Sequence, residues 1–132
     1  MNTLLLRLQP NTFLRESIEE FCLKHAPTGA AMVTCVGSLT IARLRMAGGT
    51  TIIEKEGPFE IVSLVGVWTP QGGHWHIALS NKDGELWGGH LCTGSVVYTT
   101  AEIVLADIGP HRPTREYDPQ TGYAELLVRR PT

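Results

Sequence analysis

The sequence predicts an α+β fold, in which a mainly antiparallel sheet of seven or eight strands is flanked by one main helix. One amphipathic segment near the start is followed by eight short β-rich runs separated by Gly and Pro. The 132 residues, of which 42% are hydrophobic, suffice for one ordinary core but not for two comfortable domains. Residues 1–132 are therefore expected to form a single domain.

The first part of the chain combines an extended segment with a helix. Residues 3–9, TLLLRLQ, are expected to be extended, and Pro10 closes them. Segment 11–27 then repeats apolar residues at helical spacing, which predicts a buried face made of Leu14, Ile18, Phe21 and Cys22. Asn11 or Thr12 is a candidate cap for the first turn, and Pro27 ends the helix.

Short runs of β-branched, apolar and aromatic residues follow the helix. The predicted strands cover residues 30–37, 39–45, 50–56, 59–69, 74–80, 85–92, 96–108 and 122–130. Segment 109–122, GPHRPTREYDPQTG, is rich in Pro and charge and is predicted to be a surface loop. The only concentration of basic residues lies in this segment and in the last strand, and its members are candidate nucleic-acid contacts: Arg112, Arg115, Arg129 and Arg130.

Composition narrows the classes of function. Three widely spaced cysteines without a C-x-x-C pair suggest neither a disulfide framework nor a four-thiolate zinc site, so Cys22, Cys35 and Cys92 are expected to be core thiols. The formal charge of -2 argues against strong nonspecific DNA binding by the lone chain. No apolar run approaches a signal peptide or the ~20 residues of a membrane span, so we expect a cytoplasmic location without a membrane partner.

The stretch 72–92, GGHWHIALSNKDGELWGGHLC, contains three of the five histidines. Its turn, NKDG, favours a three-residue loop that ends with Gly84 in the left-handed conformation, because a two-residue primed turn would require positive φ at Lys82. This loop places His76 opposite His90 and His74 opposite Cys92. The other face of the hairpin then carries an apolar set suited to the core: Trp75, Ile77, Leu79, Trp87 and Leu91.

This register puts three imidazoles on one face of two adjacent strands. At such spacing their nitrogens can converge on one ion at ~2.0 to 2.1 Å. We therefore predict a divalent metal site, with zinc as the expected ion, on His74, His76 and His90. Three protein ligands leave a fourth position open, for which Cys92 is a candidate. The alternative is that the histidines are solvated or hydrogen-bonded without an ion.

Two carboxylates stand inside otherwise apolar strands. Glu60 lies in GPFEIVSLVG and Glu102 lies in TTAEIVL, where an ionised group needs a partner or solvent. If either reaches the histidine face, it could orient an imidazole or act as a general base, which makes both candidate catalytic residues. Alternation along the strands could equally place both on the solvated side of the sheet.

The segments GPFEIVSLVGVW and GGHWHIALSNKDGELWGGHLC, with the opening LLLRLQP and VGSLTIARLR, resemble the PPC domain (plant and prokaryote conserved) over nearly the whole chain. The resemblance implies an antiparallel sheet flanked by helices, assembled as a homotrimer, and prokaryotic stand-alone members are described as DNA-binding proteins. Some prokaryotic relatives hold a metal through the histidines that match His74, His76 and His90. Plant members follow an AT-hook, whose Arg-Gly-Arg-Pro core this chain lacks.

Two hypotheses of different class follow for the function. The first is a regulatory module that assembles as a homotrimer, carries the three-histidine metal site and contacts DNA or a protein partner. The second is a small metal-dependent enzyme of hydrolase or lyase type, which uses a water on the ion held by the three histidines. The enzyme hypothesis requires an open pocket at the imidazoles with a carboxylate nearby.

Overall fold

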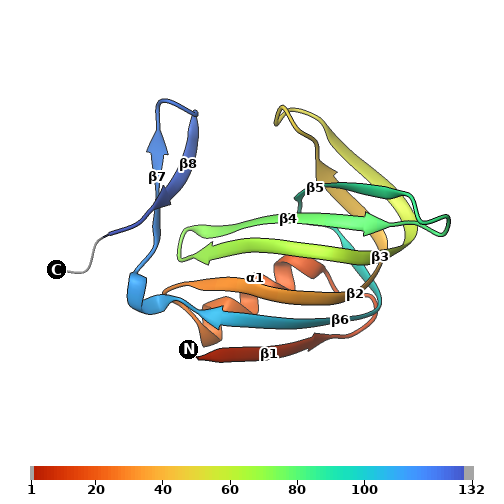
Figure 1. Ribbon diagram of the computed structural model, residues 1–132, viewed down its shortest axis with the longest axis horizontal. Coiled ribbons are helices and arrows are strands. Elements are labelled where there is room, and N and C mark those ends of the chain that lie inside the picture. Colours follow the sequence, from red (N-terminus) through yellow and green to blue (C-terminus); the bar gives the residue numbers. More distant parts are fainter. Residues whose placement is uncertain (1, 130–132) are drawn as a thin grey trace.

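A six-stranded antiparallel sheet forms the body of the protein (Figure 1), and the computed structural model describes residues 2–129. Its strands lie in the order β1 (Thr3–Leu8), β6 (Val96–Asp107), β2 (Ala30–Arg45), β3 (Ile52–Thr69), β4 (Gly72–Ser80) and β5 (Leu86–Leu91). A separate two-stranded sheet joins β7 (Thr114–Asp118) to β8 (Tyr123–Leu127). Eight strands and one α-helix among the described residues confirm the predicted α+β class.

The long strand β2 makes the sheet curl. Along its 16 residues it pairs with β6 on one side and β3 on the other. Its last residues also pair with β5, so that Leu44 lies opposite Leu91 and Arg45 opposite His90. Register shifts along β2, the signs of bulges, increase the local twist and allow the end of β2 to pair with the edge strand β5 as well. This closure places the end of β2 beside the histidine hairpin.

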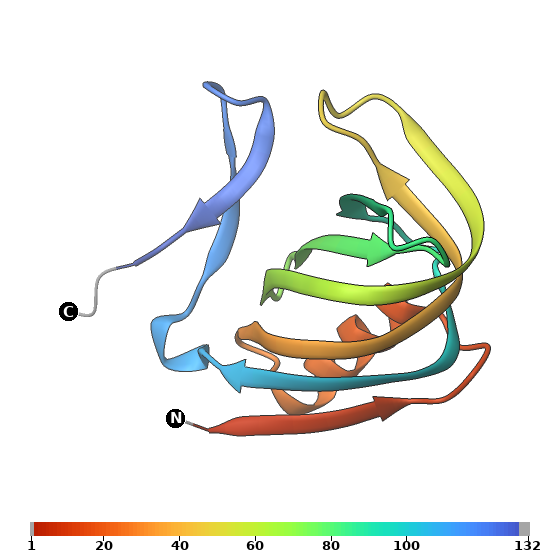
Figure 2. The ribbon, with the colours of Figure 1, turned by 45° about the vertical axis from the view of Figure 1, so that its right-hand side comes forward.

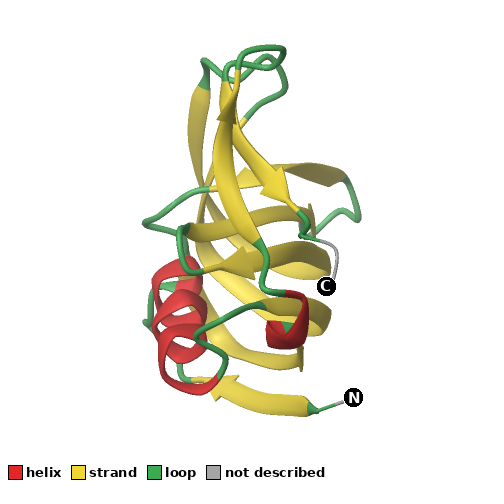
Figure 3. Cartoon of the chain, turned by 90° about the vertical axis from the view of Figure 1, so that its left-hand side faces the viewer, coloured by secondary structure: helices red, strands yellow, loops and turns green. Residues whose placement is uncertain are grey.

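Helix α1 (Leu14–His25) covers one face of the sheet (Figure 3). Three residues of its predicted apolar face, Leu14, Ile18 and Cys22, are fully buried, which confirms the periodicity argument. The predicted cap is wrong: Phe13 occupies the capping position without a side-chain hydrogen bond, while the Thr12 hydroxyl donates to the Gln9 carbonyl. No helix within residues 2–129 combines the length and apolar content that a bilayer crossing requires.

Two predicted loops are strand instead. Segments 30–37 and 39–45 form the single strand β2, and segments 50–56 and 59–69 join in β3. The Gly-containing positions near these junctions resemble strand breaks in the sequence, but bulges accommodate them within the strands. Segment 109–122 is not simply a surface loop. It contains the short helix η1 (Gly109–His111) and β7, whose extended backbone is stabilised by pairing with β8.

The core lies between α1 and the inner face of the curled sheet. Trp75 and Leu79 from β4 and Leu105 from β6 are completely inaccessible to solvent. All three cysteines are free and buried, as predicted, and burial raises the pKa of the Cys22 and Cys35 thiols to about 12. These two thiols are therefore packing groups rather than nucleophiles.

Candidate metal centre

The hairpin β4–β5 has the predicted register. Gly84 adopts φ of 78°, the Asn81 carbonyl accepts a hydrogen bond from the Gly84 N–H, and the Glu85 carbonyl accepts one from the Asn81 N–H. The Asn81 side-chain oxygen also accepts from the N–H groups of Asp83 and Glu85 at 2.9 Å each, which fixes the turn. As a result His76 lies directly opposite His90.

The three histidines form one group on the face of the hairpin that points away from α1. Their ligand atoms all lie within 4.8 Å of one another, and the Nε2 atoms of His74 and His76 are 3.2 Å apart. Zinc–nitrogen bonds of ~2.0 to 2.1 Å in tetrahedral geometry require nitrogens about 3.3 Å apart. The His74–His76 pair already has this spacing, and a nitrogen of His90 lies within 4.8 Å of both.

Cys92 does not join this group. Pairing between β4 and β5 ends at His76 and His90, so the predicted pair of His74 with Cys92 does not form. The Cys92 N–H donates to the Arg43 carbonyl of β2, and its buried thiol lies 3.7 Å from the His90 carbonyl oxygen. The chain turns toward β2 at this point, which directs the thiol away from the imidazoles.

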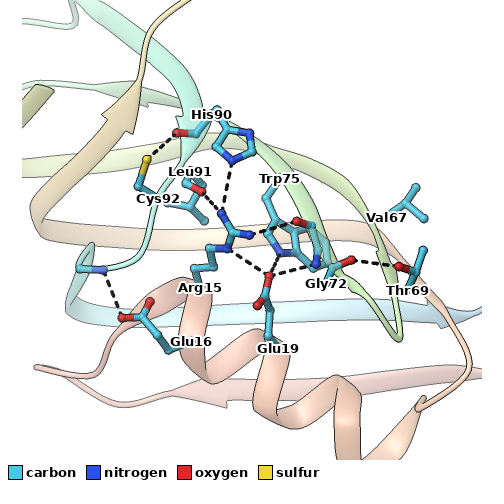
Figure 4. Close-up of polar contacts among 12 residues, drawn as sticks. Arg15, Glu16, Glu19, Val67, Thr69, Gly72, Trp75, His90, Leu91 and Cys92 are labelled. Atoms are coloured by element: carbon cyan, nitrogen blue, oxygen red, sulfur yellow. Dashed lines mark hydrogen bonds and ion pairs between the residues drawn. The ribbon is translucent and has the colours of Figure 1, made fainter. Parts of the chain in front are cut away.

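A partly buried polar network holds the hairpin against the helix (Figure 4). One oxygen of Glu19, Oε1, accepts hydrogen bonds from Arg15 Nε at 3.0 Å, from the Gly73 N–H at 3.1 Å and from Trp75 Nε1 at 3.0 Å. Arg15 also donates to the carbonyls of Gly73 and Leu91. One helical ion pair thus fixes both strands that carry histidines.

Arg15 also contacts one of the three histidines, His90. Arg15 Nη1 lies 3.3 Å from His90 Nε2, and because a guanidinium only donates, Nε2 of the neutral ring accepts this contact and the buried Nδ1, which has no hydrogen-bond partner, carries the proton. Burial, followed by Arg45 and Arg15, lowers the pKa of His90 to about 4, and burial also lowers the pKa of His74. These rings are neutral at pH 7, which is the form that binds metal.

A cavity of about 970 Å³ opens over the histidines. Its floor is formed by β3, β4 and β5, one wall by Arg45 at the end of β2 and Gly49 in the β2–β3 connection, and another by the β7–β8 hairpin. That hairpin stands beside the main sheet rather than within it (Figure 2), and it supplies Arg115, Tyr123 and Glu125. No local sequence pattern indicates this wall, because its residues lie 25 or more positions away from His90.

The predicted catalytic carboxylates lie apart from the cavity lining. Glu60 is exposed and pairs with Ser80 of β4, four residues along the strand from His76, which corresponds to about 13 Å. Glu102 is exposed on β6 between Arg7 and Val36 of the neighbouring strands. The carboxylate that lines the cavity is Glu125, which sequence reasoning did not identify.

The predicted basic group is divided by the structure. Arg115 is half-buried in the cavity wall and donates to the Val67 carbonyl at 3.4 Å. Arg112 and Arg129 are exposed, and the pairing of Thr114 with Leu127 puts both just beyond the same end of the hairpin. Arg130 lies outside the described residues.

Fold and site together define an α+β protein with a curled antiparallel sheet, one covering helix and a three-histidine group on the uncovered face. The sequence pattern of the Plants and Prokaryotes Conserved (PCC) domain matches residues 1–109. The chain belongs to this family, which confirms the resemblance named above as PPC. The match includes all three histidines, whereas the β7–β8 hairpin lies beyond it.

Several known proteins are similar to this chain. A hypothetical protein from Salmonella cholerae-suis is 32% identical, with a TM-score of 0.92 over 97% of this chain and 93% of that one. The metal-containing protein from Archaeoglobus fulgidus is 30% identical, with a TM-score of 0.73 over 96% and 94%. A candidate DNA-binding protein from Bacteroides thetaiotaomicron shares the fold, with a TM-score of 0.86 at 20% identity over 98% and 94%.

Among curated proteins, the bifunctional protein GlmU of Synechococcus sp. (strain JA-3-3Ab) is 42% identical over 123 residues, which is 93% of this chain. The matched region is 20% of that relative, so the chain spans about a fifth of its length.

The Glu19 network predicts unequal effects for two neighbouring glutamates. Glu19→Ala should lower the free energy of unfolding by about 2 kcal/mol or more, because it leaves the buried Trp75 N–H and the Arg15 guanidinium without their acceptor. The control is Glu20→Ala, which removes only an exposed ion pair with Lys24 and should change stability by less than about 0.5 kcal/mol. Urea unfolding followed by tryptophan fluorescence measures both. Equal losses in the two variants would contradict the role given to Glu19.

Proposed function

We propose that this chain is a metal-binding regulatory module in which His74, His76 and His90 hold one divalent ion, with zinc as the preferred ion. The observation that carries the proposal is the convergence of the three ring systems, whose centroids lie 4.8, 5.5 and 5.8 Å apart. Soft-to-borderline nitrogen donors without carboxylates suit zinc better than magnesium or calcium. When bound, the ion would supply a Lewis acid with one coordination position left for a small ligand.

Two further facts support the metal proposal. Burial lowers the pKa of both His74 and His90, so these rings are neutral at pH 7, which is the form that binds metal. The related protein from Archaeoglobus fulgidus, 30% identical to this chain, is described as metal-containing. The proposal extends that property to the matching histidines here.

The module works as a homotrimer in this proposal. Support comes from the face of the sheet that α1 leaves uncovered, where Val33, Val36, Val62 and Val65 of β2 and β3 are each 56% exposed. Several exposed valines on two neighbouring strands are typical of a surface that another chain covers. The family resemblance indicates a second and a third copy of the same chain as the occupants.

DNA contact, in the same proposal, belongs to the assembled protein. Three chains of -2 carry a total charge of about -6, so binding requires a local positive surface rather than net charge. Arg112 and Arg129 at one end of the β7–β8 hairpin provide the exposed guanidinium groups for it. The structural neighbour from Bacteroides thetaiotaomicron, a candidate DNA-binding protein, shares the fold on which this arrangement rests.

A metal-dependent enzyme of hydrolase or lyase type is the second candidate, because the three histidines line an open cavity of about 970 Å³. The carboxylate in that cavity is Glu125, whose Oε1 accepts a hydrogen bond from the Thr121 hydroxyl at 3.0 Å. This group, rather than Glu60 or Glu102, would be the proton acceptor for a bound molecule.

Metal analysis tests the site directly. The purified parent protein should contain about one divalent ion per chain, and His90→Ala should lose most of it, since two protein ligands seldom retain zinc. His111→Ala, which removes an exposed histidine outside the group, is the matched control and should keep the parent content. Elemental analysis by mass spectrometry gives the numbers. Equal metal in the parent and in His90→Ala would refute the assignment.

Substitution of one of the exposed valines of β2 and β3 tests the trimer. Light scattering should give three times the chain mass of 14.5 kDa for the parent. Val36→Asp should shift the protein to the monomer, because an aspartate would bury a charge in the interface. Leu23→Asp is a fair control, since Leu23 is similarly exposed at 58% but lies on the helix at the other side of the molecule. A monomeric parent would end the trimer proposal.

Salt dependence tests DNA contact. Binding of a short duplex, followed by fluorescence anisotropy between about 50 and 200 mM salt, should weaken linearly on a logarithmic plot. The double variant Arg112→Ala, Arg129→Ala should make this salt slope shallower by about two for each chain that contacts the duplex. Each guanidinium accounts for about one phosphate contact, and each contact for about one unit of slope. Absence of binding at the lowest salt, or an unchanged slope in the variant, would exclude these arginines as the DNA surface.

A further inference from the structure

Two arginines in the histidine cavity have no ion-pair partner. The ion pairs among residues 2–129 are Arg15–Glu19 and Lys24–Glu20, so neither Arg45 nor Arg115 takes part in one, although both line the cavity. Arg115 Nε is in addition buried without any hydrogen-bond partner. A guanidinium offers five donors and no acceptor, so half-buried examples without an anion leave hydrogen-bonding capacity directed at whatever enters the space.

The two guanidinium groups lie on opposite sides of the histidines. Arg45 is the cross-strand partner of His90, and its Cζ lies 5.9 Å from the ring centre of Tyr123 in the opposite wall. Arg115 donates to the carbonyl of Val67, which is itself the cross-strand partner of His74. The two groups therefore approach the histidine group from different strands, Arg45 beside His90 and Arg115 beside His74.

The cavity is positive in a chain that is negative overall. Its charged lining residues are Arg45, Arg115 and Glu125, which sum to +1 before any ion is counted. Glu125 is already engaged by the Thr121 hydroxyl, and it forms no ion pair with Arg115 within the 4.0 Å that defines the two pairs above. A divalent ion on the three histidines would raise the sum to +3, which favours a negatively charged occupant.

The floor of the cavity leaves room for that occupant. Gly88 is required here because a Cβ would lie 2.5 Å from the Ile77 carbonyl oxygen, and Gly89 lines the same floor without a side chain. A volume of about 970 Å³ lies at the upper end of the range found for small-molecule sites.

We infer that this cavity binds a small organic anion, whose carboxylate or phosphate group lies between Arg45 and Arg115 while a second oxygen reaches the open position above the three histidines. The inference deepens the metal proposal, since it names the ligand class of the same site, but the two arginines would recognise the anion even without the ion. Arg115 comes from the hairpin beyond residue 109, so this half of the recognition lies outside the part that matches the family pattern.

The test is a calorimetric titration of the full chain, zinc-loaded and EDTA-treated, at constant ionic strength. The probes are malate as a chelating carboxylate, inorganic phosphate as the alternative oxyanion, and malamide as the neutral analogue of malate. Malate or phosphate should bind the parent, and malamide should not. Arg45→Gln and Arg115→Gln should each weaken binding about tenfold or more, because each removes a charge-assisted hydrogen bond. Arg45→Lys, which keeps the charge, should lose less.

Arg7→Gln is the matched control, because it removes an exposed arginine of β1 that lies outside the cavity lining, and it should leave anion binding unchanged. Thermal unfolding of each variant checks that the fold is retained. Arginine-dependent binding in the EDTA-treated protein supports the inference even if the parent holds no metal. Binding of malamide equal to malate, no binding of either anion, or equal binding by the double variant Arg45→Gln, Arg115→Gln and the parent overturns it, even if the metal is present.

Discussion

One carboxylate oxygen, Oε1 of Glu19, accepts a hydrogen bond from Arg15 within α1 and two from Gly73 and Trp75, which join the helix to the strand carrying two of the histidines. Its acceptance from the Trp75 ring fixes that indole in the core, where it is completely buried. Trp75 stands between His74 and His76, and successive side chains of a strand point to opposite faces. Holding the tryptophan inward therefore holds both histidines outward, so the geometry of the site follows from an interaction on the other side of the sheet.

The histidine hairpin could be predicted from the sequence because two independent constraints agree on its register. Gly84 permits the left-handed turn, and alternation places the apolar residues Trp75, Ile77 and Leu79 on one face. The same reasoning placed Cys92 wrongly, opposite His74. The local pattern carries no sign that the chain leaves β4 after His90 and turns to pair with β2, which is a long-range contact.

The surroundings of the histidines could not be predicted for a related reason. Arg45 reaches the site only because the long strand β2 curls onto β5, and the positions that allow the curl look like ordinary loop signals in the sequence. Arg115 lies in a segment rich in Pro and charge, whose five-residue strand is stabilised by its partner β8 rather than by a buried apolar face. Local periodicity locates a hairpin well, but it cannot show which distant side chains surround it.

The β7–β8 hairpin is joined to the body of the protein by a short connection and pairs only with itself. Most of its side chains are exposed, and none belongs to the buried core between α1 and the main sheet. Substitutions in this hairpin can therefore alter the wall of the cavity with little effect on the stability of the main sheet and helix. Such a division lets relatives diverge in what they recognise while they keep one scaffold, so the hairpin is where variation among them should concentrate.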